Sequence, residues 1–192
     1  MRLTLAFAVV SVWASTFLVQ PYVVDSTSME PAILPGDSVL VDKNGERAVR
    51  RGDVIVFRDP VEGADPLVKR VIGLPGESIH IEHGRVTVNG EVLSEPYKRE
   101  SGLSHCAAGC RFDVPAAHYF VLGDNRDHSI DSRVFGFVPA SHVMGRPWLV
   151  FWSTEDRGVT LRPNARMREL APNTTRISFR GTRWQRFFQI IR

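Results

Sequence analysis

Few residue patterns in this chain could perform chemistry, and the clearest candidate pairs a serine with a lysine. The sequence contains no Gly-x-Ser-x-Gly turn, no His-Glu-x-x-His helix and no glycine-rich phosphate loop. None of its six histidines stands in a setting typical of a Ser-His triad. A serine activated by a lysine is one of the variants of that triad, and it is the chemistry that the remaining residues favour.

Lys69 lies in an apolar run from Leu67 to Ile72, which suits a lysine that has to lose its proton. A serine hydroxyl is a poor nucleophile until a base removes its proton. A lysine can be that base only if its pKa falls from about 10.4 toward neutrality, and burial lowers it. On a strand, Lys69 shares a face with Leu67 and Val71, while Arg70 has a similar apolar setting. Chemistry selects Lys69, because arginine stays protonated in proteins.

Ser28 is the candidate nucleophile, followed by Met29, Glu30 and Pro31. Pro31 biases Glu30 toward an extended conformation, which keeps the backbone near Ser28 open. By itself, a serine close to a proline is more commonly a turn or capping residue. The neighbouring motifs therefore decide its role.

Four motifs, in the same order along the chain, are similar to those of the type I signal peptidases, a family of membrane-anchored serine proteases with a Ser/Lys dyad. They are Ser28 to Pro31, Arg51 to Phe57, Lys69 to Gly76 and Gly123 to Arg133. The resemblance implies an endopeptidase that removes N-terminal signal peptides from exported preproteins after small residues, at Ala-x-Ala-like sites. Ser28 would be the nucleophile and Lys69 the general base, with no metal or other cofactor.

The resemblance also implies the supporting residues of this site. The hydroxyl of Ser26 and the backbone N–H of Ser28 would form the oxyanion hole. Ser129 would hydrogen-bond the lysine amine and orient it. Asp131 and Arg133 would form a supporting ion pair.

Short apolar stretches between turn residues predict a mainly β body. The expected strands cover residues 38–41, 53–57, 67–72, 78–93, 118–122 and 147–152, and the fourth contains hairpin turns at His83-Gly84 and Asn89-Gly90. The resemblance implies a catalytic β domain of residues 25–79 and 118–192. Residues 80–117 would form a small β-rich insert that carries both cysteines.

An uncharged segment from Leu3 to Val24 predicts one N-terminal transmembrane helix, assigned to residues 1–24. As a helix it spans about 33 Å, enough to cross a bilayer. A cleavable signal peptide is the alternative, although its only Ala-x-Ala pattern, Ala6 to Ala8, lies too near the start. The positive-inside tendency places the N-terminus in the cytoplasm. The catalytic domain is then expected on the outer, periplasmic side of the cytoplasmic (inner) membrane.

The net charge of +3 is unevenly placed, because residues 157–192 contain nine Arg and one Glu. On charge alone this tail could meet nucleic acid or anionic lipid. The anchor favours membrane lipid, and we expect no nucleic-acid partner. Trp184, Phe187, Phe188 and Ile191 recur at helical spacing, which predicts a helix lying on the membrane. A final helix or strand that packs on the core remains an alternative.

Cys106 and Cys110 are the only cysteines, and their spacing permits a small disulfide loop. An oxidising compartment outside the cytoplasmic membrane would favour that bond. Two free thiols are the alternative. A zinc site with nearby histidines is disfavoured, because the spacing matches no common ligand pattern.

Three other functions are compatible with parts of the sequence. A dedicated peptidase for one substrate, such as a conjugation pilin, would carry the same motifs. A membrane-tethered scaffold could retain them without catalysis. A self-cleaving repressor protease shares Ser-Lys chemistry, but it should be soluble and carry a DNA-binding domain, for which there is no room before Ser28.

Overall fold

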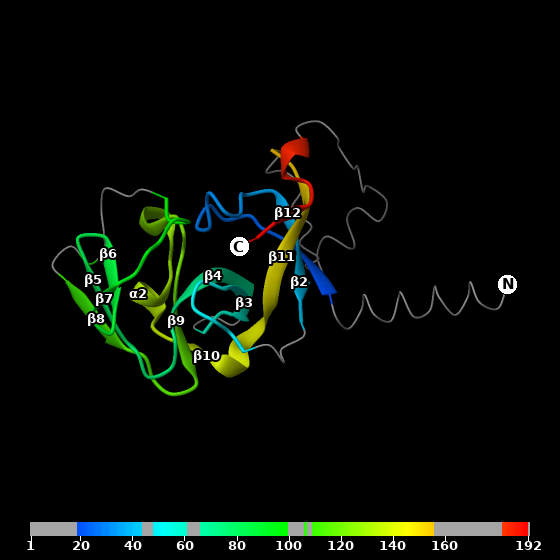
Figure 1. The fold of residues 1–192 in the computed structure, drawn as a ribbon. Coiled ribbons are helices and arrows are strands. Elements are labelled where there is room, and N and C mark those ends of the chain that lie inside the picture. Colours follow the sequence, from blue (N-terminus) through cyan, green and yellow to red (C-terminus); the bar gives the residue numbers. More distant parts are fainter. Residues whose placement is uncertain are drawn as a thin grey trace, which may run out of the picture.

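The computed structural model describes residues 19–43, 48–60, 66–99, 106, 109–155 and 182–191, which build two β-sheets (Figure 1). The larger sheet contains β1 (Val19–Val23), β2 (Asp37–Asp42), β3 (Val54–Arg58), β4 (Pro66–Gly73), β9 (His118–Leu122), β10 (Val138–Pro139), β11 (Val143–Ser153) and β12 (Gln189–Ile190). The smaller sheet contains β5 (Ser78–Glu82), β6 (Arg85–Val88), β7 (Glu91–Val92) and β8 (Cys110–Asp113). The described helices are short: η1 (Arg126–His128), α2 (Ser132–Phe135), η2 (Ala140–His142) and η3 (Trp184–Arg186).

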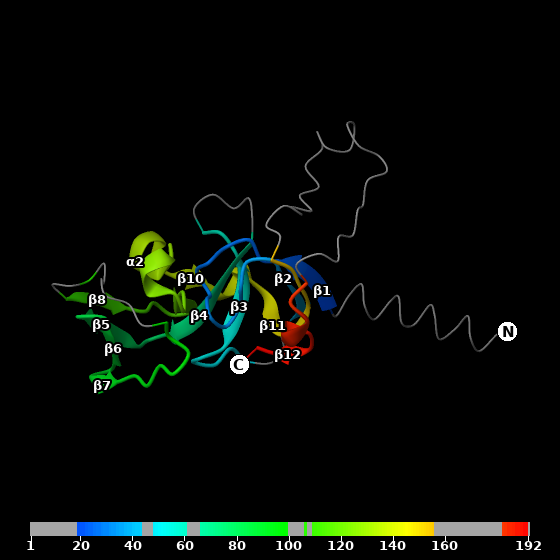
Figure 2. The ribbon, with the colours of Figure 1, turned by 90° about the horizontal axis from the view of Figure 1, so that it is seen from above.

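The prediction of a mainly β fold is confirmed. The larger sheet runs in the order β1-β2-β11-β3-β4-β9-β10, with β12 on β11, and the smaller in the order β7-β6-β5-β8. The long strand β11 bridges the larger sheet, because it pairs with both β2 and β3 and carries register shifts in each pairing. The smaller sheet lies at the opposite end of the molecule from β1 (Figure 2).

The predicted hairpin turns follow from local sequence. His83 and Asn89 both have positive φ, 48° and 52°, and each is followed by a glycine with positive φ. This pattern matches the left-handed pair that a two-residue hairpin needs. The two turns connect β5 to β6 and β6 to β7.

The predicted transmembrane helix of residues 1–24 is wrong at its carboxyl end. Val19–Val23 instead form β1, antiparallel to β2. Pairing with β2 satisfies the backbone polar groups, and Pro21, which has no N–H, is tolerated because β1 is an edge strand. Residues 1–18, the rest of the predicted helix, lie outside the described residues. Within the part of the chain that is described, no helix is long and apolar enough to span a membrane.

The core consists of three clusters of buried apolar side chains. One joins the smaller sheet to β4 and β9 through residues such as Ile79 and Phe120. A second packs Met29 and Ile33 of the Ser28 motif against β2, β3 and β11. The third packs Ile55 against Val121 and other side chains of the larger sheet. Burying an Ile or Phe side chain stabilises the fold by about 1.5–3 kcal/mol, so these clusters firmly fix β4 and the Ser28 motif.

The smaller sheet overlaps the predicted insert of residues 80–117, although its first strand begins at Ser78. Cys106 and Cys110 form a disulfide, with Cα atoms 5.3 Å apart. This loop lies next to β8, and Cys106 is buried in the first core cluster. The division of the chain into an insert and a catalytic domain stays a prediction.

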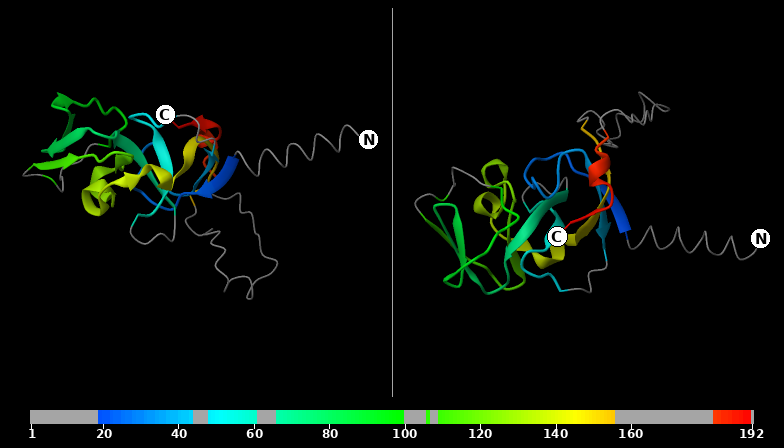
Figure 3. Two further views of the ribbon diagram at one scale, coloured as in Figure 1. Left: turned by 90° about the horizontal axis from the view of Figure 1, so that it is seen from below. Right: turned by 45° about the horizontal axis from the view of Figure 1, so that its top comes forward.

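Residues 182–191 return to the larger sheet, where the C-terminal segment lies along β11 (Figure 3). The segment contains one 3-10 turn, η3, followed by the strand β12. The predicted interfacial helix is therefore wrong, and the alternative of a packing strand holds. The physical reason is Asp37, a fully buried carboxylate that accepts hydrogen bonds from Arg186 at 2.6 Å and from the Ser153 hydroxyl at 2.6 Å. Arg186 therefore points into the protein instead of toward solvent.

Replacing Arg186 with alanine should lower the free energy of unfolding by about 3 kcal/mol, because Asp37 would keep a buried charge without its main counterion. Urea unfolding of the full chain in detergent, followed by tryptophan fluorescence, measures this loss. Arg111→Ala is the matched control, because the Arg111–Asp113 pair is mostly exposed and 3.6 Å apart. A loss for Arg186→Ala no larger than for the control would contradict the role of this ion pair.

Candidate active site

Ser28 and Lys69 lie together although 41 positions separate them in the sequence. The Lys69 Nζ donates a hydrogen bond to the Ser28 Oγ at 2.9 Å and a second to the Val68 carbonyl oxygen at 3.0 Å. Both side chains are buried, with 3% of Ser28 and 4% of Lys69 exposed. The strand β4 supplies Lys69 opposite Ile55 of β3. Ser28 comes from the turn between β1 and β2.

Burial is the main cause that lowers the pKa of Lys69, to about 8 from its usual 10.5, against an upward influence from the carboxylate of Asp131. A buried ammonium loses hydration, and this favours the neutral amine. The two hydrogen-bond partners of Nζ are a hydroxyl and a carbonyl, neither of which carries a negative charge. A substantial fraction of Lys69 is therefore neutral near physiological pH, as a general base requires.

The turn that carries Ser28 is held by hydrogen bonds from backbone and side-chain groups. The Asn125 N–H donates to the Ser28 carbonyl oxygen at 3.0 Å, and the Asn125 side-chain amide donates to the Thr27 carbonyl oxygen at 3.1 Å. The Glu30 N–H closes the turn onto Thr27 at 3.2 Å. The Ser28 N–H donates to the Ser26 hydroxyl at 3.2 Å. The two groups predicted for the oxyanion hole are therefore adjacent, with Ser26 at the exposed surface.

Ser129 lies beside the turn, but its predicted hydrogen bond to Lys69 is not formed in this structure. Its Oγ is buried and has no hydrogen-bond partner. Gly123 lies close to this hydroxyl, because a Cβ at position 123 would clash with it. A Cβ at position 123 would lie 2.6 Å from the Ser28 carbonyl oxygen and would also overlap the Ser129 side chain. The absence of a side chain at Gly123 lets the two segments approach.

Asp131 and Arg133 form the predicted ion pair, with Arg133 Nε donating to Asp131 Oδ1 at 2.8 Å. Asp131 is fully buried, and its other oxygen accepts the Gly123 N–H at 3.0 Å. Asp131 also accepts the Arg133 N–H and so caps α2. Arg133 Nη2 donates to the Arg126 carbonyl oxygen at 2.7 Å. The pair thus fixes the shape of the loop that holds Ser129.

Sequence reasoning missed two ion pairs of this site. Arg70 donates to both carboxylate oxygens of Asp124, at 2.8 and 2.7 Å, with both side chains buried. The guanidinium of Arg70 also lies 4.1 Å from the centroid of the Tyr97 ring. Arg126 pairs with Glu95. Arg70 and Arg126 lie inside motifs that pack into the protein, and a buried guanidinium requires a carboxylate partner. Their positions could therefore have indicated these two ion pairs.

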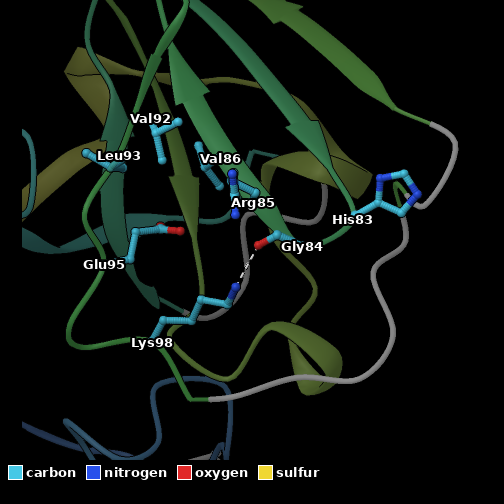
Figure 4. Close-up of a pocket in the computed structure, with 8 residues that line it drawn as sticks. All are labelled: His83, Gly84, Arg85, Val86, Val92, Leu93, Glu95 and Lys98. Carbon is cyan, nitrogen blue, oxygen red and sulfur yellow. Dashed lines mark hydrogen bonds between the residues drawn. The ribbon is translucent and has the colours of Figure 1, made fainter.

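A shallow pocket of about 320 Å³ lies on the smaller sheet and contains none of the predicted site residues (Figure 4). It is lined by His83, Gly84, Arg85, Val86, Val92, Leu93, Glu95 and Lys98. Among the described residues, no three His, Cys, Asp or Glu side chains converge as metal ligands.

Comparison with known proteins identifies the family. The sequence model of the family described as "Signal peptidase, peptidase S26" matches residues 1–152 of this chain. The chain belongs to the signal peptidase family. Membership makes it a serine endopeptidase, a hydrolase of peptide bonds, in agreement with the resemblance of its four motifs.

Relatives from different bacteria carry the same family name. A probable signal peptidase I-2 of Synechocystis is 34% identical, over 75% of this chain and 68% of its own length. The signal peptidase I of Leptolyngbya laminosa is 36% identical, over 74% and 73%. The signal peptidase I of Pseudomonas aeruginosa is 31% identical, over 78% and 70%. A crystal structure of a signal peptidase I from Enterococcus faecalis, 34% identical, matches 52% of this chain and 97% of that one with a TM-score of 0.46. The assignment therefore rests on the sequence matches.

The pH dependence of peptide cleavage should report the Lys69 amine. As pH falls below about 8, a growing fraction of the amine is protonated and cannot accept a proton, so activity falls with it. We expect kcat/KM to rise about tenfold per pH unit at low pH and then to level off. The midpoint of the transition should lie near pH 8. Initial rates on a fluorogenic signal-sequence peptide between pH 5 and 10 measure this. A flat profile across that range would argue against a lysine base.

Proposed function

We propose that this signal peptidase removes N-terminal signal peptides from exported preproteins, with Ser28 as nucleophile and Lys69 as general base. The observation that carries the proposal is the 2.9 Å contact between the Lys69 amine and the Ser28 hydroxyl in a nearly water-free setting. A neutral amine at this distance can accept the hydroxyl proton instead of donating one.

The geometry supports a two-step reaction. In the first step, the Lys69 amine takes the Ser28 proton as Oγ attacks the scissile carbonyl carbon, and the lysine then protonates the leaving amine. The C–N bond breaks and an acyl ester on Ser28 remains. In the second step, Lys69 takes a proton from water as the water oxygen attacks the ester carbon. The ester C–O bond breaks, the signal peptide leaves with a new carboxyl group, and the lysine returns the proton to the Ser28 Oγ.

The oxyanion formed in both steps would be held by the Ser28 N–H and the Ser26 hydroxyl. In the structure, the Ser28 N–H donates a hydrogen bond to the Ser26 hydroxyl at 3.2 Å. Substrate binding would turn the Ser26 hydroxyl so that both hydrogens point at the carbonyl oxygen. Each such donor contributes about 2.7–4 kcal/mol to lowering the barrier in serine proteases.

A preference for small residues before the cut fits the tight packing around the nucleophile. Met29 and Ile33, both nearly or fully buried, pack directly behind the Ser28 turn in the second core cluster. We expect this close packing to leave only shallow, apolar subsites for substrate side chains. Small residues such as alanine at an Ala-x-Ala-like site would be accommodated.

Ser28→Ala and Lys69→Ala should each lower cleavage of a purified preprotein by at least about 10⁴-fold, because each removes one half of the dyad. The assay uses the full chain in detergent, with the cut site read by mass spectrometry. The wild-type protein should cut after a small residue at an Ala-x-Ala-like site.

The controls for this experiment are Ser141→Ala and Lys43→Ala, which change the same residue types away from the dyad. Activity retained in Ser28→Ala or Lys69→Ala would refute the assigned roles. Several unrelated preproteins should be tested together. Cleavage of only one of them would indicate a dedicated peptidase, and cleavage of none by a folded wild-type protein would favour a non-catalytic scaffold.

We also propose that the C-terminal segment, residues 182–191, rests on the outer surface of the cytoplasmic membrane. Trp184 and Phe188 are exposed by 66% and 73%, and Ile190 of β12 is exposed by 59%. Trp184 stacks on Phe187 with ring centroids 5.1 Å apart, so the aromatic rings form one patch. The C-terminal segment with β12 lies at the same end of the molecule as β1, opposite the smaller sheet (Figure 2). Exposed tryptophan and phenylalanine favour the interface of a bilayer.

The membrane proposal predicts a difference between two substrates. The double variant Trp184→Ser with Phe188→Ser should lower cleavage of a preprotein reconstituted in lipid vesicles by about tenfold, since burial of two aromatic side chains is lost. Cleavage of a short soluble peptide should not change. Val92→Ser is the control, because Val92 is 61% exposed on the smaller sheet at the opposite end. An equal effect on both substrates would contradict membrane contact.

A further inference from the structure

Residues 94–99 form a strap that leaves the smaller sheet after β7 and crosses to the active-site loops. The strap is anchored at its start and middle. Glu95 pairs with Arg126 of the Gly123 to Arg133 motif, and the ring of Tyr97 stacks on Arg70 of the Lys69 motif. Lys98 Nζ donates to the Gly84 carbonyl oxygen at 2.6 Å, across the pocket on the smaller sheet (Figure 4). The strap therefore contacts two of the motifs before it reaches Arg99.

Arg99 connects the two segments that meet at the nucleophile. Its backbone N–H donates to the Asp124 carbonyl oxygen at 3.0 Å. Its guanidinium donates to the Glu30 carboxylate at 2.6 Å. Glu30 is two residues after Ser28, and Asn125, next to Asp124, holds the Ser28 carbonyl oxygen. Asn125 and Arg99 thus both hold the turn that carries Ser28, the first through the Ser28 carbonyl oxygen and the second through Glu30.

The Arg99–Glu30 ion pair is partly exposed to water, and this allows a positioning role to be distinguished from a contribution to stability. The side chain of Arg99 is 54% exposed and that of Glu30 is 23% exposed. An ion pair so accessible to water contributes little to global stability. It can nevertheless restrict the turn that carries the reacting oxygen, and reaction rates respond to displacements of about 1 Å.

We propose that Arg99 is a positioning residue of the peptidase, which holds the Ser28 turn against the Asp124–Asn125 loop through its ion pair with Glu30. The proposal rests on the proposed function, because it concerns the same nucleophile. Arg99 acts on the chemical step through Glu30 and does not touch the reacting atoms. The strap thereby connects the smaller sheet to the turn that carries Ser28. The pocket lined by Glu95 and Lys98 lies between the strap and the smaller sheet.

The test compares steady-state cleavage of one preprotein by the wild-type protein, Arg99→Ala, Arg99→Lys and Glu30→Ala. We expect Arg99→Ala to lower kcat about tenfold with KM within about twofold of wild type. Arg99→Lys should recover most of the lost kcat, because a lysine can still pair with Glu30. Glu30→Ala should match Arg99→Ala, and the double variant should be no slower than either single variant.

Arg111→Ala is the matched control, because it removes an exposed arginine from an ion pair on the smaller sheet that does not reach the motifs. Its kcat should equal that of wild type, and thermal unfolding of Arg99→Ala should match that of the control. Unchanged kcat in Arg99→Ala, or a loss of kcat that Arg99→Lys does not recover, would overturn the positioning role. Ser28→Ala is assayed in parallel. If wild type cleaves no preprotein, the proposed function fails and the positioning role with it. If only the Arg99 results disagree, the peptidase function stands.

Discussion

The rest of this structure depends on keeping one amine out of water without giving it a counterion. Lys69 is almost fully buried, and its Nζ bonds a hydroxyl and a carbonyl oxygen. Burial lowers the pKa of Lys69 to about 8. A direct carboxylate partner would reverse that effect by stabilising the ammonium form. The surrounding fold therefore has to bury the lysine while directing every nearby carboxylate elsewhere.

The arginines around the site meet this constraint. Arg70, adjacent to Lys69 on β4, forms an ion pair with Asp124, and Arg133 forms one with Asp131. Arg126 likewise forms an ion pair with Glu95. Each of these buried cations has a carboxylate, whereas the hydrogen bonds of Lys69 are to neutral groups. Asp131 still raises the pKa of Lys69 from a distance, but less than burial lowers it. The ion pairs thus organise the loops and leave Lys69 without a direct carboxylate partner.

The sequence predicted much of this site because its chemistry depends on residue type. Arg70 shares the apolar run with Lys69, but an arginine stays protonated whereas a buried lysine can become neutral, so side-chain chemistry distinguished the two. The hairpin turns at residues 83–84 and 89–90 were predicted for a similar reason, since they follow from local backbone preference. The end of the predicted anchor and the C-terminal helix were wrong. Both segments are strands because β2 and β11 offer them partners, which a periodicity pattern does not reveal.

The sequence alone indicated the serine endopeptidase class and the mainly β body, and it predicted Ser28 and Lys69 as the reacting pair, because motif composition and local backbone preference are properties of neighbouring residues. Tertiary structure decided which distant groups pair. It brought Asp37 to Arg186, Asp124 to Arg70 and Glu30 to Arg99, across separations from 54 to 149 positions. It also left the buried Ser129 hydroxyl without a hydrogen-bond partner. Such pairings depend on how the strands are ordered in space, and the free energy of a buried charge depends on all of its surroundings.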